Sequence, residues 1–576
     1  MIDLSYQISP TPTLSDITLR RGGFVTISDA LDYAATGKSG TNFYSSKGLL
    51  THATSYKELR QQSLSVAAQL LDTGAQPGEF VGIIAETNRS FQHAFYACQY
   101  IGLIPVPISF NRYIGGHSAY LERVNRIVQD CRAKILIAPS SLIQAFRDAD
   151  TKTTHLLSFA ELDLKRELRP EDRKTSEIAY IQYSSGSSSF PKGVIVTQTA
   201  ATANATAILR DGLQLRPDDR ANSWLPFYHD MGLMGFMIAP MFGQCSVDYM
   251  APSTFVRRPT LWLELISRNK ATISFAPPFG YEATNRALAV TSTTTLDLSC
   301  WRVAGIGGDT INAAILAEFA ERTVHMGFGQ KAFAPSYGMA EATLAISMTE
   351  PGAGLNTISI SETGPAEPSN FVKCGKPLRN LQIRVADRSG YTLPDGVQGE
   401  LQIKGDSVLK EYLNQGEQSS PPLMQDGYFK TGDLGFIYEG QIIITGRLKD
   451  LIIVNGRNVW PDDIEWIAQR VSGIGHGDVV AFEGENLQNL TTPPIVVLIH
   501  IRGNRQLVEE KKEKIRFAIS EELGVSVAVH IVAAGAISLT SSGKIRRSEA
   551  RRNFLTSCSN QHVPADHYHA SAESGI

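Results

Sequence analysis

The stretch Tyr183-Ser-Ser-Gly-Ser-Ser-Ser-Phe-Pro-Lys-Gly193 decides how this chain is interpreted. Two strand-like apolar runs, Ile178–Tyr183 and Val194–Val196, flank it, so we expect it to connect two strands. It supplies backbone N–H groups, small hydroxyls and a lysine, which are the groups that bind a polyphosphate. The P-loop pattern G-x-x-x-x-G-K-[ST] is absent, because Pro191 stands where its second glycine should be. The stretch therefore predicts either another kind of nucleotide-binding loop or a flexible surface hairpin.

Length and composition narrow the class of protein. A chain of 576 residues is too long for one ordinary core, so we expect at least two domains. Its 43% hydrophobic and 19% charged residues are typical of a soluble globular protein, and a net charge of −3 argues against nucleic-acid binding. No apolar run of ~20 residues and no signal-peptide pattern occur, so we expect a cytoplasmic protein without stable membrane insertion. The six cysteines include no C-x-x-C pair, which favours reduced thiols over a zinc site.

The N-terminal part alternates between helical and strand-like segments. Ser55-Tyr-Lys-Glu58 has the form of a capping box, which predicts that a helix begins there. Strands are expected at Phe80–Ala85, from Leu103 and at Ala133–Ala138, and a helix from about Asn88. This order predicts an α/β domain with a largely parallel sheet.

The C-terminal part has two different textures. From residue 375 to 438, short strand-like pieces alternate with Gly, Pro and Asp turns, which predicts a small β subdomain. After Gly446-Arg-Leu-Lys-Asp450 a compact α+β unit follows. We expect its helices and strands near residues 462–470, 478–482, 494–501, 506–523 and 526–532. The expected domains are therefore residues 1–447, with the β subdomain at about 375–445, then 448–557, and a disordered tail over 558–576.

Four further segments carry side chains suited to chemistry. Trp224–Gly235 contains His229 and Asp230 among aromatic and Met residues, and Tyr337–Thr343 contains Glu341, which could hold a divalent cation. Two more lie further along the chain: Asp433 in a Gly-flanked turn, and Lys544 in Thr540-Ser-Ser-Gly-Lys. Taken singly, each also has a structural explanation: a satisfied core histidine, a surface glutamate, a turn-shaping aspartate and a solvent-exposed lysine.

Taken in order, these segments resemble the motifs of the adenylate-forming superfamily, which contains acyl-CoA synthetases, peptide-synthetase adenylation domains and luciferases. The loop at residues 183–193 is similar to Y-[ST]-S-G-[ST]-[ST]-G-x-P-K-G except that Ser189 replaces the third glycine. Residues 337–341 resemble Y-G-x-[ST]-E, with Ala340 at the fourth position. The other matches are Tyr428–Asp433 to Y-x-x-T-G-D, Gly446–Ile452 to G-R-x-K-[DE]-x-I, and Ser542–Lys544 to S-G-K.

Within the superfamily the chain looks most like the fatty acyl-AMP ligases. The string Trp224-Leu-Pro-Phe-Tyr-His-Asp-Met-Gly-Leu-Met-Gly235 carries this narrower resemblance, together with Phe255–Pro259, Trp262, residues 271–274 and 301–304, and Ser189. The resemblance implies an α/β N-terminal domain of mostly parallel sheets flanked by helices, with a small β-barrel subdomain, and a small, mobile α+β C-terminal domain. It also implies ATP and Mg²⁺ as cofactors, a fatty acid as substrate, and a separate acyl carrier protein as acceptor.

The resemblance also implies roles for individual residues. Lys544, Glu341 and His229 are the predicted catalytic residues, and Glu341 is also the predicted Mg²⁺ ligand. The predicted ATP- and AMP-binding residues are Ser184, Ser185, Gly186, Ser187, Ser188, Lys192, Gly308, Asp309, Tyr337, Gly338, Met339, Asp433, Arg447 and Lys544. The predicted acyl-pocket residues are Phe227, Met231, Gly232, Met234 and Phe279, for which plain core packing is the alternative. Lys449 and Asp450 are the predicted hinge.

The implied reaction is attack of a fatty-acid carboxylate on the α-phosphorus of ATP, which releases pyrophosphate and leaves an acyl-adenylate. Pro351–Asn370 lies where the acyl-AMP ligases carry an insertion associated with rejection of coenzyme A, and it is short. Two other functions stay open: a long- or medium-chain acyl-CoA synthetase, and a non-catalytic nucleotide or lipid sensor.

Overall fold

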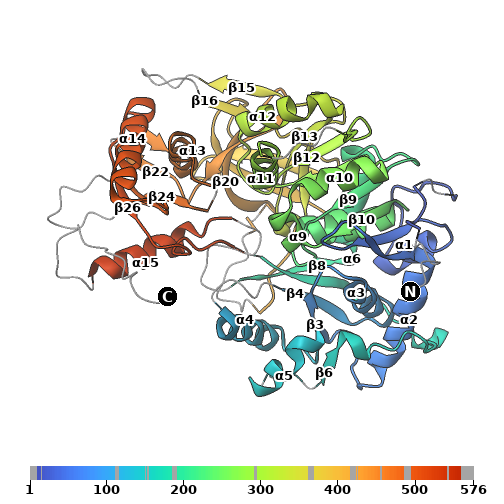
Figure 1. Cartoon of the computed structure of the whole chain (residues 1–576). Helices are drawn as coiled ribbons and strands as arrows, with labels where there is room; N and C mark the ends of the chain where they lie inside the picture. The colour runs from blue at the N-terminus through green and yellow to red at the C-terminus, as the bar shows by residue number, and fades with distance from the viewer. Residues whose placement is uncertain are drawn as a thin grey trace, which may run out of the picture. The chain divides into compact units, whose positions relative to one another are not determined.

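The structure is a computed structural model of the chain (Figure 1). It describes residues 9–13, 16–110, 116–149, 151, 153, 155–184, 191–290, 295–360, 369–414, 423–424, 426–454, 457–475, 477–484, 495–540 and 544–559. These form two compact units. The larger unit contains most residues up to Thr445, and the smaller one is built mainly from Gly446 onward. The expected tail lies outside the described residues, apart from 558 and 559 at the end of the last helix.

The main sheet of the larger unit has nine strands in the described part of the chain. Its order is β17 (Lys376–Pro377), β14 (Ala345–Met348), β13 (Phe333–Gly338), β12 (Val303–Ile306), β11 (Ile273–Ala276), β9 (Arg220–Ser223), β10 (Ser246–Met250), β1 (Gly40–Tyr44) and β2 (Leu50–Ser55). The neighbouring strands from β13 to β1 are parallel, and only the edge pairs are antiparallel. Parallel strands require crossover connections, and helices between them cover the sheet.

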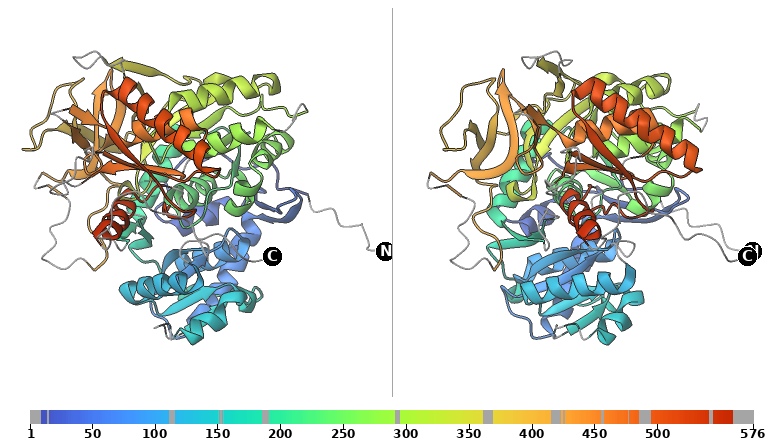
Figure 2. Two further views of the ribbon diagram at one scale, coloured as in Figure 1. Left: turned by 60° about the vertical axis from the view of Figure 1, so that its left-hand side comes forward. Right: turned by 90° about the vertical axis from the view of Figure 1, so that its left-hand side faces the viewer.

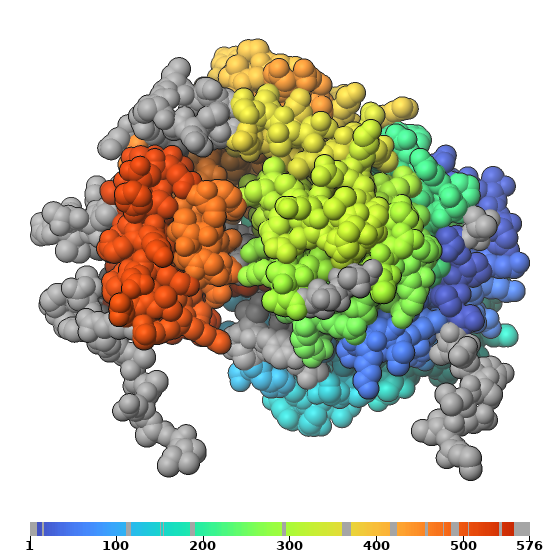
Figure 3. All heavy atoms as spheres, turned by 45° about the horizontal axis from the view of Figure 1, so that its top comes forward, coloured from blue at the N-terminus to red at the C-terminus, as the bar shows by residue number. Residues whose placement is uncertain are grey.

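Aromatic side chains hold three of these helices together: α10 (Thr260–Asn269), α11 (Pro278–Leu288) and α12 (Ala313–Thr323). Trp262 packs edge-to-face on Tyr281 at 5.4 Å between ring centroids, and Tyr281 on Phe319 at 5.0 Å. This segment forms one continuous green to yellow-green surface in the space-filling view (Figure 3). Because the rings are fully buried, they fix the helices that follow β10, β11 and β12. The larger unit has further α-helices at α1 (Ile27–Ala34), α6 (Gln198–Ala207), α7 (Asp230–Leu233), α8 (Ala239–Phe242) and α9 (Pro252–Arg257). Two segments are π-helical, η3 (Ile208–Gly212) and η4 (Met234–Ile238). The short 3-10 helices are η1 (Phe159–Glu161), η2 (Pro170–Asp172), η5 (Val324–Met326), η6 (Gln330–Ala332) and η7 (Ala340–Ala342).

A second, four-stranded sheet is parallel throughout, in the order β4 (Ile104–Ser109), β3 (Phe80–Ala85), β5 (Ile135–Ala138) and β6 (His155–Ser158). Its helices are α2 (Tyr56–Leu71), α3 (Arg89–Ile101), α4 (Gly116–Cys131) and α5 (Ser140–Asp148). The predicted capping box is confirmed: the Glu58 N–H donates to the Ser55 hydroxyl at 3.2 Å, and the Ser55 N–H to the Glu58 carboxylate at 2.8 Å. The predicted α/β alternation with a parallel sheet is therefore confirmed.

Three further parts of the structure are antiparallel. The serine-rich stretch connects β7 (Ile178–Tyr183) to β8 (Gly193–Thr197), which pair as predicted. The predicted β subdomain is a four-stranded sheet in the order β18 (Leu381–Ala386), β19 (Gly399–Gly405), β20 (Phe429–Tyr438) and β21 (Gln441–Arg447) (Figure 2). The short insertion at 351–370 contains β15 (Thr357–Ile360), which pairs with β16 (Ser369–Val372).

The smaller unit is an α+β sandwich around the sheet β24 (Val479–Glu483), β25 (Ile495–Ile499) and β26 (Val527–Ile531). Side chains alternate between the two faces of a strand, so Val479 and Val497 pack with α13 (Pro461–Ser472) and α14 (Arg505–Leu523). Val480 and Leu498 face the other way and pack with α15 (Arg547–Ser559). The ribbon β22 (Ile452–Val454) and β23 (Arg457–Val459) precedes α13.

Candidate active site

The candidate site of the larger unit follows the carboxyl ends of neighbouring parallel strands. His229 comes after β9, Phe279 after β11, Gly308 and Asp309 after β12, and Glu341 after β13. The carboxyl ends of parallel strands lie at one edge of the sheet, and this edge is the usual ligand-binding edge of an open α/β sheet. Residues that are more than a hundred positions apart in sequence are thus brought to one edge.

Close backbone approaches explain several of the glycines here. A Cβ on Gly232 would lie 2.1 Å from the carbonyl oxygen of Pro226, and one on Gly338 would lie 2.0 Å from that of Leu344. Gly308 has φ +83°, and its Cβ position is 3.0 Å from the Met231 methyl group. The loops after β9 and β12 therefore touch, and this contact places Met231 beside the predicted adenine-binding segment.

Tyr337 and Asp433 are joined directly. The Tyr337 hydroxyl donates to the Asp433 carboxylate at 2.7 Å, and both residues are buried. The sequence predicted Asp433 in a turn, and this is wrong, because Asp433 lies within β20. Between two paired positions, β20 has Thr431, Gly432 and Asp433 where β19 has only Leu401, so the strand bulges. The glycine with φ +72° permits the bulge, which sets Asp433 out of the regular ladder.

Glu341 and Lys192 both meet Tyr412, a residue that the motifs did not indicate. The Tyr412 hydroxyl donates to Glu341 Oε1 at 3.0 Å, and Lys192 Nζ lies 4.9 Å from the centre of the Tyr412 ring. Burial, and then the charge of Glu341, raise the pKa of Tyr412, so its hydroxyl keeps its proton. Tyr412 is 71 positions from Glu341, so no local sequence pattern linked them.

The ends of the serine-rich stretch close on each other. The Ser184 N–H donates to the Lys192 carbonyl at 2.9 Å, which forms the base of the connection between β7 and β8. The predicted phosphate-binding residues Ser185, Gly186, Ser187 and Ser188 lie outside the described residues.

His229 has a close acidic partner. Its Nδ1 lies 2.7 Å from Asp230 Oδ1, and that oxygen also accepts the Met231 N–H at the start of α7. The pair lies at the start of α7, which is the first helix after β9.

The predicted acyl-pocket residues have different surroundings. Phe227 stacks on Phe91 at 5.4 Å and meets Tyr249 edge-to-face at 5.1 Å, as a core residue does. Met234 is fully buried in η4, and Phe279 lies edge-on to the Trp224 ring at 5.6 Å. Trp224 itself stacks on Phe255 at 3.8 Å. Apolar and aromatic side chains therefore surround the segment that follows β9.

The smaller unit carries the remaining predicted residues. Lys544 follows a loop closed at its base, where the Thr540 N–H donates to the Lys544 carbonyl at 2.6 Å and the Lys544 N–H to the Thr540 hydroxyl at 3.0 Å. Arg447 ends β21, and its carbonyl accepts the Asp450 N–H at 3.0 Å, which makes the predicted hinge around Lys449 a tight turn. Asp450 also accepts from Arg547 at 3.2 Å.

Three observations concern a possible metal site, the reactivity of the cysteines and membrane-spanning helices. Within the described ranges, no group of three or more His, Cys, Asp and Glu side chains could hold a metal by itself. Magnesium usually takes one or two carboxylates and completes its shell with substrate phosphates and water, so a site at Glu341 fits this donor set. Burial raises the pKa of the Cys131, Cys245 and Cys374 thiols to about 12, which makes them poor nucleophiles. A search of the described helices found none that is long and apolar enough to span a membrane.

Comparison with known proteins identifies the family. Residues 36–413 match the family model described as AMP-binding enzyme, so the chain belongs to the AMP-binding enzyme family. A Caulobacter vibrioides protein, provisionally named an acyl-CoA synthetase, is 40% identical over 571 residues, which cover 95% of this chain and 98% of that protein. The Mycobacterium tuberculosis long-chain-fatty-acid–AMP ligase FadD26 is 31% identical and covers 84% of this chain and 88% of its own length.

Two further matches are a relative named as a ligase of an acyl carrier protein and a solved structure with the same fold. The Moorena producens medium-chain-fatty-acid–[acyl-carrier-protein] ligase JamA is 29% identical over 92% of this chain and 95% of its own length. A solved structure from a study of fatty acyl-adenylate ligases of E. coli and L. pneumophila has a TM-score of 0.87 and 36% identity, and covers 94% of this chain and all of that one. Each of these matches thus covers more than nine-tenths of the chain.

Proposed function

We propose that this protein is a fatty acyl-AMP ligase. It uses ATP to convert a fatty acid to an acyl-adenylate, and the acyl group then passes to the phosphopantetheine of a separate acyl carrier protein. The observation that carries this proposal is the convergence of the loops after β9, β12 and β13 at one edge of the parallel sheet, with Tyr337 bonded to Asp433. The similarity to FadD26, JamA and the fatty acyl-adenylate ligases supports the choice of acid and acceptor.

The chemistry asks the protein to bring two anions together. A carboxylate oxygen of the fatty acid forms a bond to the α-phosphorus, and the bond from that phosphorus to the bridging oxygen of pyrophosphate breaks. Ser184 to Ser188 and Lys192 hold the β- and γ-phosphates, and Glu341 binds the magnesium ion that accompanies them. Bound magnesium supplies positive charge that offsets the charge of the phosphates. Charge compensation and alignment are the main catalytic terms in such a reaction.

The nucleoside is held by the other residues of the edge. The Asp433 carboxylate accepts hydrogen bonds from the ribose hydroxyls, and the Tyr337 hydroxyl orients this carboxylate. Gly308, Asp309, Gly338 and Met339 line the adenine slot, where the absence of side chains on the glycines lets a flat base approach the backbone. Arg447, in the chain segment that precedes the hinge, is the further residue that we assign to the ribose.

Lys544 supplies the catalytic cation for the transfer. We expect Lys544→Ala to slow pyrophosphate release by about 10²–10³-fold, because one electrostatic contact to the transition state is lost. ATP binding, measured by calorimetry, is expected to change little. Release of pyrophosphate at the wild-type rate by this variant would refute the assignment.

An acyl-CoA synthetase is the second candidate, and the 40% identical Caulobacter vibrioides relative favours it. The two functions share the first step and differ in the acceptor. The protein is incubated with ATP, Mg²⁺ and a series of fatty acids, with coenzyme A, with a phosphopantetheinylated acyl carrier protein, or with neither. Accumulation of acyl-adenylate that only the carrier protein consumes supports the proposal, and formation of acyl-CoA overturns it in favour of the synthetase.

A further inference from the structure

A short connection after the β subdomain strand β19 contacts both the Glu341 segment and strand β8. The Leu409 N–H donates to the Glu341 carbonyl at 2.8 Å, and the Leu413 N–H to the Gly193 carbonyl at 2.8 Å. Tyr412 pairs with Val194 of β8 as an isolated antiparallel bridge. The backbone of residues 409–413 therefore joins the loop after β13 to the strand that ends the serine-rich stretch.

The side chain of Tyr412 joins the same two elements. Its hydroxyl donates to Glu341 Oε1 at 3.0 Å, and its ring lies within 4.9 Å of Lys192 Nζ. An ammonium group within about 6 Å of an aromatic ring centre is attracted to the face of that ring. A phenol that donates to a carboxylate restricts its rotation and leaves its other lone pairs for further ligands. One side chain thus acts on both groups proposed to contact the magnesium and phosphates of ATP.

We infer that Tyr412 is a positioning residue that sets the Glu341 carboxylate for the metal ion and the Lys192 ammonium for the phosphates. This inference rests on the proposed function, because it takes the roles of Glu341 and Lys192 from it. Tyr412 itself touches neither metal nor phosphate in this scheme.

The hydroxyl and the ring can be tested separately. Tyr412→Phe removes only the hydrogen bond to Glu341, and Tyr412→Leu removes the ring as well. Replacing a group that orients a metal ligand typically costs about 10–100-fold in metal affinity or activity. We therefore expect Tyr412→Phe to raise the Mg²⁺ concentration for half-maximal pyrophosphate release about tenfold. Tyr412→Leu should in addition raise the KM for ATP at saturating Mg²⁺, while the KM for the fatty acid stays unchanged in both variants.

A matched control exists on β20. Lys373 Nζ lies 5.0 Å from the Tyr438 ring centre, so Tyr438→Leu removes the same kind of contact at a tyrosine with no assigned role in the site. We expect Tyr438→Leu to leave both the Mg²⁺ dependence and the KM for ATP unchanged. Thermal unfolding of each variant establishes that it is folded, and the isosteric Tyr412→Phe carries the test if Tyr412→Leu does not fold.

Glu341→Gln separates failure of this inference from failure of the proposed function. If Glu341→Gln shifts the Mg²⁺ dependence and Tyr412→Phe does not, the inference is overturned and the function stands. If Glu341→Gln leaves the Mg²⁺ dependence unchanged, the metal assignment in the proposed function is overturned. With both assignments right, the double variant shows no larger shift than Glu341→Gln alone, because Tyr412 acts through Glu341.

Discussion

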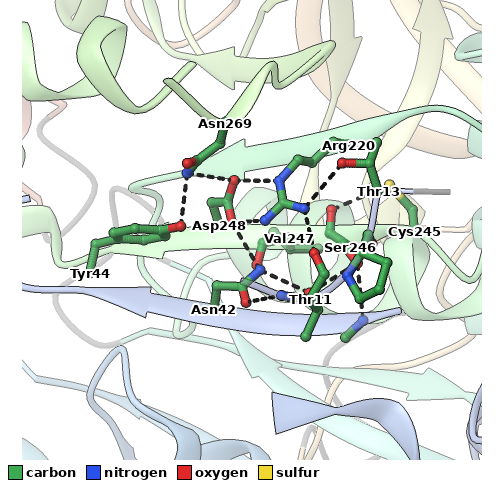
Figure 4. A network of polar contacts seen from close by, with 12 residues as sticks. Thr11, Thr13, Asn42, Tyr44, Arg220, Cys245, Ser246, Val247, Asp248 and Asn269 are labelled. Atoms are coloured by element: carbon green, nitrogen blue, oxygen red, sulfur yellow. Dashed lines mark hydrogen bonds and ion pairs between the residues drawn. The ribbon is translucent and has the colours of Figure 1, made fainter. Parts of the chain in front are cut away.

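Two arginines, one buried in the larger unit and one 14% exposed in the smaller unit, are paired with acids in opposite ways. Arg220 of β9 is 2% exposed and makes two bonds to one acid, Asp248 of β10, through Nε at 2.7 Å and Nη2 at 2.5 Å (Figure 4). Its remaining donor group reaches neutral oxygens, the Thr11 carbonyl at 2.8 Å and the Thr13 hydroxyl at 3.3 Å. The Asp248 oxygens accept in turn from neutral amides, with Asn42 at 2.9 Å.

Arg547, in contrast, is surrounded by three acids from two other segments. Its Nη2 donates to Asp462 at 2.7 Å and to Glu465 Oε1 at 2.9 Å, both on α13, and its Nη1 to Asp450 at 3.2 Å. The acids outweigh the opposing effect of burial and raise the pKa of Arg547. Burial, which the charge of Arg547 only partly offsets, raises the pKa of Glu465 to about 8.

The difference lies in charge balance. A one-to-one pair completed by neutral hydrogen bonds leaves no excess charge, and the Arg220 network holds the N-terminal segment against the sheet through the Thr11 carbonyl. Three carboxylates around one guanidinium leave excess negative charge, so the Arg547 cluster depends on pH. The balanced network lies in the sheet, and the unbalanced one joins the predicted hinge at Asp450 to the helix that follows Lys544.

Removing Arg220 is expected to have the largest effect. Arg220→Met leaves Asp248 buried without a counter-charge, which typically costs about 3–5 kcal/mol in unfolding free energy. Urea unfolding followed by hydrogen exchange of peptides from β9 and β10 measures the loss for the larger unit. The double variant Arg220→Met/Asp248→Leu serves as control and should regain much of the stability, because no buried charge is left. An unchanged midpoint for the single variant would contradict the interpretation.

Removing Arg547 should cost less, since its partners Asp450 and Asp462 are partly solvated at 23% and 38% exposure. We expect Arg547→Met to lower the local stability of the smaller unit by about 2 kcal/mol. Hydrogen exchange of peptides from α13 and α15 measures this local change. Peptides from β9 and β10 provide the internal comparison and should keep their protection, because the two clusters share no residue. Equal loss of protection in both sets would show that the cluster supports the whole chain instead.

How much of this fold the sequence predicts depends on how local the signal is. The strand Phe80–Ala85 was predicted with its observed bounds, and the capping box of α2 was predicted at Ser55 and Glu58, because each depends on a few neighbouring residues. The strand β9, Arg-Ala-Asn-Ser, escaped prediction. Three of its four residues are polar and all four are buried, and Arg220 is paired with Asp248 of the neighbouring strand β10 (Figure 4). Propensity scales do not include partners that lie far away in sequence.

The candidate site shows the same limit. Motif residues such as Glu341, Asp433 and Lys544 were predicted because they lie in short, unusual strings. The bulge that carries Asp433 was taken for a turn, since glycines on both sides favour either one. Tyr412 was missed, because its role depends on contacts with Glu341 and Lys192 that only folding creates.

The smallest expected effect is a pH dependence that belongs to Glu465. Its folded-state pKa of about 8 lies above its ordinary value of 4.5, so its contribution to stability is fully present below about pH 4.5 and is lost as the pH rises through about 8. From pH 6.5 to 7.5 this loss is at most about 1.4 kcal/mol. We expect protection of the α13 peptides, corrected for intrinsic exchange, to fall over this interval in the wild type and to stay level in Glu465→Gln, whose amide cannot ionise.

Glu522→Gln is the matched control for this experiment, because Glu522 pairs with Arg470 at 39% exposure and its charge is screened by water. This variant should follow the wild-type pH dependence. If Glu465→Gln instead loses protection as the wild type does, Glu465 is ionised throughout and Arg547 fully compensates it. The cluster would then act as a balanced pair like that of Arg220 and Asp248, with the charges of Asp450 and Asp462 screened by water. The two arginines would then differ only in their exposure.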